Sequence, residues 1–266
     1  MLIGPEKFKT LAESKNAIIL DASRPKPGQK KFELKEFIPN ARRFNYSKEF
    51  SAPGSSLPNT APDPSYFQEQ AQKLGINDDS ILLIYDCHGL FSSPRAWYMF
   101  KVMGHQQVYV LNGGLPAWKS MGYPTSTSLI SKWTLGNFIS KPLRKGFVGI
   151  HDVLENKNHI VVDARGKNRF SGKAKEPREG IRSGHIPGAI NLPYTELLTE
   201  RGTYKSKNEL IELFDKIPDQ VYFSCGSGVT ACILALAAEH IGREQTEVYD
   251  GSWTEYGASS YPVSTE

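Results

Sequence analysis

The stretch VYFSCGSGVTACILALAAEH, residues 221–240, decides the fold of this 266-residue chain. A short apolar run ends at Ser224, Cys225 and a glycine-containing turn follow, and the pattern predicts a long apolar helix from near Val229. The first amides of a helix have no partner within it, and they lie at the positive end of its dipole. The pattern therefore predicts a reactive thiol at an anion-binding turn.

Two glycines shape this predicted turn. Gly226 and Gly228 allow the backbone to curl so that several amides face one point. A buried structural cysteine is the alternative interpretation of Cys225. The order of strand, cysteine, glycine turn and helix favours the anion site.

A phosphatase loop has a related pattern, in which an arginine six positions after the cysteine grips the phosphoryl oxygens. That position is Ala231 here. Without a guanidinium the loop has no bidentate contact for a phosphate, so the sequence disfavours phosphoester hydrolysis.

The chain also repeats itself. The two halves carry the same ordered segments. The matched pairs are AIILDAS (17–23) with IVVDAR (160–165), FIPNA (37–41) with HIPGA (185–189), LLIYDC (82–87) with VYFSC (221–225), and VYVLNGG (108–114) with EVYDGS (247–252).

Short apolar runs alternate with helical patterns in each half, which predicts βαβ units and an α/β fold with a buried parallel sheet flanked by helices. We predict an N-terminal domain at 1–124, a linker at 125–147 that is rich in Ser, Thr and Lys, and a C-terminal domain at 148–266.

Composition excludes several classes of function. Apolar residues make up 39% of the chain and charged residues 23%, with a net charge of +4 and both signs interspersed. Nucleic acid binding is not indicated. No apolar run approaches the roughly 20 residues of a membrane span, so we predict a cytoplasmic protein without membrane contact. Three cysteines without CxxC spacing favour free thiols over a metal site.

These motifs resemble tandem domains of the rhodanese family, and the resemblance covers nearly the whole chain. CGSGVTA at 225–231 resembles the active loop of 3-mercaptopyruvate sulfurtransferases. Supporting strings are FSSPRAWYMFKVMGH (91–105), LNGGLPAW (111–118), EPREGIRSGHIPGAINLP (176–193) and YDGSWTEYGA (249–258).

The resemblance implies two tandem rhodanese-like domains and a sulfurtransferase without metal or organic cofactor. Cys225 would be the nucleophile that carries sulfur as a persulfide, and Ser227 would polarise the donor. Arg169 and Arg178, nine residues apart, would hold the carboxylate and keto oxygen of 3-mercaptopyruvate. The amides of the turn would stabilise the developing charge, which adds Gly226, Gly228, Val229 and Thr230 to the predicted substrate-binding residues.

In the family that the chain resembles, members that prefer thiosulfate have basic side chains after the cysteine, whereas Gly226 and Ser227 are uncharged. The resemblance therefore implies 3-mercaptopyruvate rather than thiosulfate as donor. The implied acceptor is a thiol, such as thioredoxin or glutathione, or cyanide. A thiosulfate:cyanide sulfurtransferase and a non-catalytic persulfide carrier or binding module are the alternatives.

The first half departs from the family pattern. In FSAPGSSLPNTAP at 50–62, Ala52 and Asn59 stand where the family usually has Asp and His. Asp86 stands at the position equivalent to Cys225, and a carboxylate cannot carry a sulfane sulfur. The N-terminal domain is therefore predicted to be degenerate, with a structural role favoured for its neighbour Cys87.

Overall fold

The computed structural model describes residues 1–29, 31–143, 146–156, 158–243 and 246–265. By its internal contacts the chain divides into two compact units. The first contains 1–54, 61–144 and 200–204, and the second contains 55–60, 145–199 and 205–266. The short segment 55–60 therefore belongs with the second unit although it precedes it in the chain.

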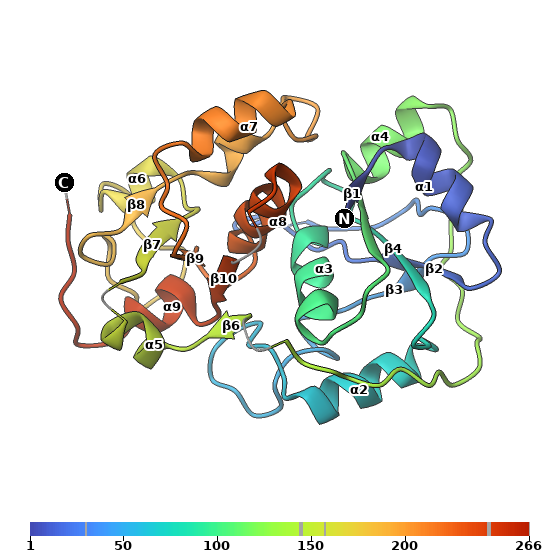
Figure 1. Cartoon of the computed structure of the whole chain (residues 1–266), viewed down its shortest axis with the longest axis horizontal. Helices are drawn as coiled ribbons and strands as arrows, with labels where there is room; N and C mark the ends of the chain where they lie inside the picture. The colour runs from blue at the N-terminus through green and yellow to red at the C-terminus, as the bar shows by residue number, and fades with distance from the viewer. Residues whose placement is uncertain (30, 144–145, 157, 244–245, 266) are drawn as a thin grey trace. The chain divides into compact units, whose positions relative to one another are not determined.

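The first unit is a parallel sheet in the order β1-β5-β4-β2-β3, with helices around it (Figure 1). Its elements are β1 (Leu2–Ile3), α1 (Pro5–Ala12), β2 (Ala17–Asp21), β3 (Arg42–Arg43), α2 (Pro64–Lys73), β4 (Ile81–Tyr85), α3 (Ser93–Val102), β5 (Val108–Leu111) and α4 (Gly114–Ser120).

The second unit repeats this topology, in the order β6-β10-β9-β7-β8, again all parallel. Its elements are β6 (Phe147–Val148), α5 (Ile150–Glu155), β7 (Ile160–Asp163), α6 (Lys167–Phe170), β8 (Ile190–Asn191), the 3₁₀ helix η1 (Tyr194–Leu197), α7 (Lys207–Phe214), β9 (Val221–Ser224), α8 (Ala231–Ile241), β10 (Thr246–Tyr249) and α9 (Ser252–Tyr256).

Helices cover both faces of each sheet, which explains the nearly continuous apolar strands. In the first unit, α1 and α4 pack on the face that carries Ile19 and Leu83. Phe67 of α2 and Phe100 of α3 meet on the opposite face, with ring centroids 5.1 Å apart. In the second unit, Trp253 of α9 packs on the face of the sheet that carries Val161 and Tyr222.

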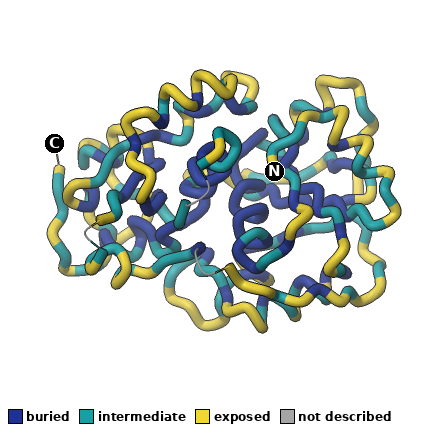
Figure 2. Tube along the Cα trace, viewed as in Figure 1, coloured by how far each residue is buried: buried dark blue, intermediate teal, exposed yellow. Residues whose placement is uncertain are grey.

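The helix that follows Cys225 is buried along most of its length. Every residue from Ala231 to Ala238 is buried, as the dark trace of this segment in Figure 2 shows. A helix that is apolar all round is typical of such a position. The apolar string ACILALAA thus makes α8 a fixed support for the turn at its N-terminus.

The predicted linker 125–147 belongs to the first unit over residues 125–143, whereas residues 146 and 147 belong to the second unit, where Phe147 begins β6. Phe138 is buried, and the amides of Gly136 and Phe138 donate to the carbonyls of Gln72 and Ile76. Residues 144 and 145 of this linker lie outside the described residues. Its polar composition therefore conceals a segment with several backbone contacts. No helix within the described ranges is long and apolar enough to cross a bilayer.

Candidate active site

Cys225 lies at the carboxyl end of β9, the central strand of the second sheet, and only 2% of its surface is exposed. The turn continues through Thr230, and α8 begins at Ala231 rather than near Val229 as the sequence indicated. Gly228 has a φ of 71°, a left-handed conformation that glycine adopts without strain. This turn delays the helix by two residues.

The start of α9 fixes the backbone of this turn. Ser252 Oγ accepts hydrogen bonds of 3.1 Å from the amides of both Cys225 and Gly228, and it donates to the carbonyl of Tyr249 at 2.7 Å. The amides of Trp253 and Thr254 donate to the carbonyls of Cys225 and Gly226, each at 2.9 Å. Both ends of the turn are therefore held.

These contacts correct one sequence expectation. The amide of Gly228 was predicted to face the substrate, but it is directed at Ser252 Oγ. Gly228 contributes its left-handed turn instead. Within the described residues, no acceptor takes the turn's other amides, which belong to Gly226, Ser227, Val229, Thr230 and Ala231. Four of the five amides predicted for the cradle therefore have no acceptor there, and the same holds for the first amide of α8.

The first unit contains the same kind of turn with an anion already in it. Asp86 directly follows β4 as Cys225 directly follows β9, and its Oδ2 accepts hydrogen bonds of 2.9 Å from the amides of Phe91, Ser92 and Ser93. The amide of His88 donates to Oδ1 at 2.8 Å. In this fold, amides before and at the start of the following helix can therefore hold an anion on the residue that ends the strand.

Of the two predicted donor-binding arginines, Arg169 lies beside Gly226 and Arg178 is linked to it through Thr254. A Cβ placed on Gly226 would lie 3.1 Å from Arg169 Nη2, so this guanidinium packs directly against the turn. Arg178 Nη1 donates to Thr254 Oγ1 at 3.1 Å, and Thr254 Oγ1 in turn donates to the Gly226 carbonyl at 2.5 Å. Arg169 therefore contacts the turn directly, and Arg178 is connected to it through one side chain.

A buried ionic network behind Arg169 was missed in the sequence. Arg165 pairs with Asp163 at 2.6 Å and with Glu176 at 2.8 Å, and it stacks on Trp253 with its guanidinium carbon 4.3 Å from the ring centroid. Glu176 also pairs with Arg169 at 2.5 Å. The available signal was the charged Arg165, two residues after the end of a buried strand in IVVDAR, where the first half has the small Ser23.

Asn59, which the sequence analysis noted only as the replacement of a family histidine, contacts Ser227. The side-chain amide of Asn59 donates to Ser227 Oγ at 3.1 Å and to the Ser227 carbonyl at 3.4 Å. Asn59 is 4% exposed and has a φ of 61°. Because an amide N–H can only donate, it occupies a lone pair of the Ser227 hydroxyl and leaves the hydroxyl hydrogen for another acceptor.

Tyr194 is a further residue near Cys225 that the sequence did not single out. Burial raises the pKa of Tyr194, and negative charge on Cys225 raises it further. The phenol of Tyr194, in η1, therefore stays protonated at neutral pH.

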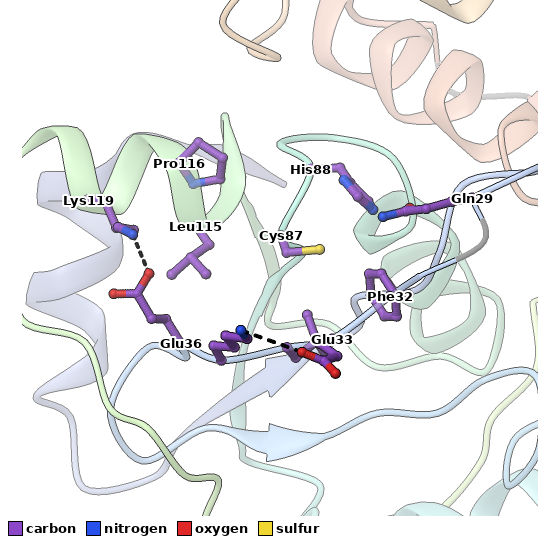
Figure 3. A pocket seen from close by; sticks show the side chains of 11 residues that line it. Gln29, Phe32, Glu33, Glu36, Cys87, His88, Leu115, Pro116 and Lys119 are labelled. Carbon is purple, nitrogen blue, oxygen red and sulfur yellow. Dashed lines mark hydrogen bonds and ion pairs between the residues drawn. The ribbon is translucent and has the colours of Figure 1, made fainter.

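A cavity of about 570 Å³ lies in the first unit beside the degenerate turn (Figure 3). Cys87 and His88 line one part of it, and the ion pair of Lys119 with Glu36 lies in another. Burial raises the pKa of Cys87 to about 11, with Asp86 and Asp21 adding to the shift. Cys87 is therefore a protonated, weakly nucleophilic thiol at neutral pH.

A known domain family matches both halves of the repeat. The model of the rhodanese-like domain matches twice, at residues 4–121 and 150–259. The 3-mercaptopyruvate sulfurtransferase of Rattus norvegicus is 38% identical, over 97% of this chain and 90% of its own length. The thiosulfate sulfurtransferase of Gallus gallus is 36% identical, over 90% of this chain and 85% of its own length.

A solved structure is similar over almost the same range. It is that of SseA from Escherichia coli, described as a 3-mercaptopyruvate sulfotransferase with the rhodanese fold. The TM-score is 0.84 at 32% identity, and the match covers 95% of this chain and 98% of the other. The similarity therefore extends through both units.

Proposed function

Because the chain belongs to the rhodanese family, we propose that it is a sulfurtransferase that takes sulfur from 3-mercaptopyruvate onto Cys225 and passes it to a thiol or cyanide. The observation that carries this proposal is the turn at Cys225, where four predicted cradle amides have no acceptor among the described residues. The Arg169 guanidinium lies beside Gly226, and Arg178 is linked to the Gly226 carbonyl through Thr254. This arrangement supports a nucleophile, an anion cradle and a carboxylate site in the second unit.

The two arginines suit the donor's carboxylate and keto oxygen. A hydrogen bond to a charged group contributes about 1.5–3 kcal/mol. Loss of both Arg169 and Arg178 is therefore expected to lower kcat/KM by about 100-fold to 10,000-fold. The half-buried position of Arg169, 25% exposed, reduces the screening of its charge by water.

The reaction transfers one sulfur atom without a redox partner. The Cys225 thiolate attacks the donor sulfur, the S–S bond forms, and the carbon–sulfur bond breaks to release the enolate of pyruvate. The proton of the donor thiol balances the enolate, which becomes pyruvate. An acceptor thiolate or cyanide then attacks the outer sulfur and returns the Cys225 thiolate.

The cradle's role is to stabilise the persulfide. A persulfide adds a second sulfur about 2 Å from Sγ, and the amides of Ser227, Val229 and Thr230 are donors available to it. Ser227 can add its hydroxyl hydrogen, because Asn59 occupies the oxygen from the other side. Such fixed donors favour charge that develops during reaction.

The proposed donor preference rests on the neutral side chains of Gly226 and Ser227, which offer no cation to the thiosulfate dianion. Thioredoxin, glutathione and cyanide are the proposed acceptors, and the cytoplasm is the proposed location. Thiosulfate sulfur transfer is the second candidate, which the similarity to the Gallus gallus protein favours.

Steady-state turnover with each donor tests the proposal, together with intact-protein mass spectrometry after donor exposure. We expect higher kcat/KM with 3-mercaptopyruvate, and a one-sulfur adduct that disappears in Cys225→Ser and persists in the matched control Cys87→Ser. A preference for thiosulfate would support the second candidate. One stoichiometric sulfur without repeated pyruvate release would indicate a persulfide carrier.

A further inference from the structure

We infer that Glu176 is a positioning residue that sets the donor preference, because it orients Arg169 and cancels its charge. This inference rests on the proposed function and concerns how the same site discriminates a monoanionic donor from a dianionic one. The turn itself cannot discriminate the donors by side-chain charge, since residues 225–231 include no Asp, Glu, Lys, Arg or His.

Glu176 holds two guanidinium groups at once. Its Oε1 accepts from Arg165 Nη1 at 2.8 Å and from Arg169 Nε at 3.1 Å, and its Oε2 accepts from Arg169 Nη2 at 2.5 Å. The Glu176 side chain is only 5% exposed, so water screens these pairs weakly. The carboxylate thus grips the Nε–Nη2 edge of Arg169 bidentately.

Glu176 is itself held from behind. Arg165 donates to Asp163 through Nε and Nη2, and Nη2 also donates to the Gly184 carbonyl at 2.8 Å. Trp253 covers the face of the same guanidinium. Since Arg165 is 1% exposed and bound on three sides, it provides a fixed anchor for Glu176.

The grip determines which edge of Arg169 remains for a ligand. Glu176 takes Nε and one hydrogen of Nη2, which leaves the edge formed by Nη1 and Nη2. That edge faces Gly226, whose added Cβ would lie 3.1 Å from Nη2 and 3.8 Å from Nη1. A carboxylate beside Gly226 can therefore bind this edge through two parallel hydrogen bonds.

The same contacts set the local charge. Asp163, Arg165, Glu176 and Arg169 carry two positive and two negative charges, and their side chains are buried or half-buried, so this network is neutral as a whole. Lys173, Lys175, Arg178 and Glu179 are exposed, so water screens their charges. A neutral network that leaves one guanidinium edge for a ligand suits the single carboxylate of 3-mercaptopyruvate better than the two charges of thiosulfate.

Glu176→Gln tests the inference, since glutamine keeps the shape and removes the charge. We expect the ratio of kcat/KM for thiosulfate to that for 3-mercaptopyruvate to rise about ten-fold, equivalent to roughly 1.4 kcal/mol. Glu176→Asp keeps the charge but shortens the reach. It should lower kcat/KM for both donors by similar factors and leave the ratio unchanged.

Glu179→Gln is the matched control, because it makes the same charge change three residues away on an exposed side chain. Its ratio should equal that of the native chain. An equal loss for both donors in Glu176→Gln would overturn the inference, since a merely structural role predicts that result. Native turnover with 3-mercaptopyruvate alongside such an equal loss would leave the proposed function intact.

The native chain offers a second test that does not depend on the variant folding. Pyruvate, a monoanion, should inhibit competitively at lower concentration than sulfate, a dianion, at constant ionic strength. Stronger inhibition by sulfate would contradict the charge match. Absence of turnover with either donor would reject the proposed function itself, which separates the two failures.

Discussion

The Asp86 turn and the Cys225 turn occupy equivalent places in two copies of one fold, and they differ in which group fills the cradle. In the first unit the cradle closes on its own carboxylate, which receives three backbone amides at 2.9 Å. In the second unit the corresponding amides have no acceptor among the described residues. The same strand–turn–helix arrangement therefore stabilises the fold where the turn binds its own carboxylate. It is available for chemistry where the anion comes with the substrate.

Exchange of the two groups tests this comparison most severely. Cys225→Asp should lower sulfur transfer by at least about 1,000-fold, because the nucleophile is removed. The chain should remain folded, since the carboxylate enters a turn of amides like that around Asp86. Turnover measurements with circular dichroism check both parts. Unfolding of this variant would show that the two turns are less alike than their contacts indicate.

Asp86→Ala should destabilise the first unit by about 3–5 kcal/mol, because buried amides lose their charged acceptor. Denaturant titration of the whole chain should show the loss in the transition that belongs to this unit. Asp86→Asn retains one carbonyl oxygen and should cost less. Equal stability of Asp86→Ala and the native chain would mean that the internal anion is not what the first cradle requires.

The two turns also differ in the residue that starts the helix packed beside them, which is Ser252 in the second unit and Gly114 in the first. They occupy equivalent repeat positions with φ of 50° and 53°, yet only Ser252 accepts the amides of its turn. Ser252→Ala should lower kcat/KM by about 10-fold to 100-fold through loss of these two hydrogen bonds. Ser252→Gly should lose similar activity but regain up to about 1 kcal/mol of stability, because glycine suits this φ.

The control is Gly114→Ala, whose Cβ would lie 2.2 Å from the Asp86 carbonyl oxygen. It should destabilise the first unit strongly and leave the chemistry at Cys225 unchanged. Thermal unfolding and donor turnover, measured on the same samples, separate the two effects. Equal activity of Ser252→Gly and the native chain would exclude the proposed role of the serine hydroxyl.

Asn59→Gly should have a smaller effect, a decrease in kcat of about five-fold to ten-fold, since one neutral hydrogen bond contributes about 1 kcal/mol. Glycine accepts the φ of 61°, so stability should change little. Asn59→Ala adds backbone strain and serves as the comparison. If Ser227→Ala in the Asn59→Gly background causes a further loss as large as in the native chain, the two residues act independently.

Cys87 should show the smallest effect, with Cys87→Ser changing turnover by less than about two-fold. Its pKa of about 11 means that at pH 8 about one thiol in a thousand is ionised. In Cys225→Ser, alkylation of Cys87 should therefore rise about ten-fold per pH unit until about pH 11. A plateau near pH 9, where an ordinary thiol ionises, would contradict the shift.

Much of the fold could be predicted because the two halves of the chain repeat the same ordered segments. The matched segments around Asp21 and Asp163, and around Asp86 and Cys225, predicted two parallel sheets of the rhodanese family, and both the sheets and the family are confirmed. Apolar periodicity depends only on residues close together in the chain, so strands and helices can be predicted from a single sequence. The domain boundaries and the site residues stay predictions, although Cys225, Arg169 and Arg178 lie together in the second unit.

The sequence by itself determined the repeat, the strand that ends at Cys225, the uncharged turn and the apolar helix behind it, because each depends on neighbouring residue types. Only the tertiary structure decided that Glu176 pairs with Arg169, that Ser252 takes the amide of Gly228, and that Asn59 reaches Ser227. These contacts join residues from 7 to 168 positions apart. Hydrogen bonds and ion pairs depend on distance and direction in space, which spacing along the chain does not encode.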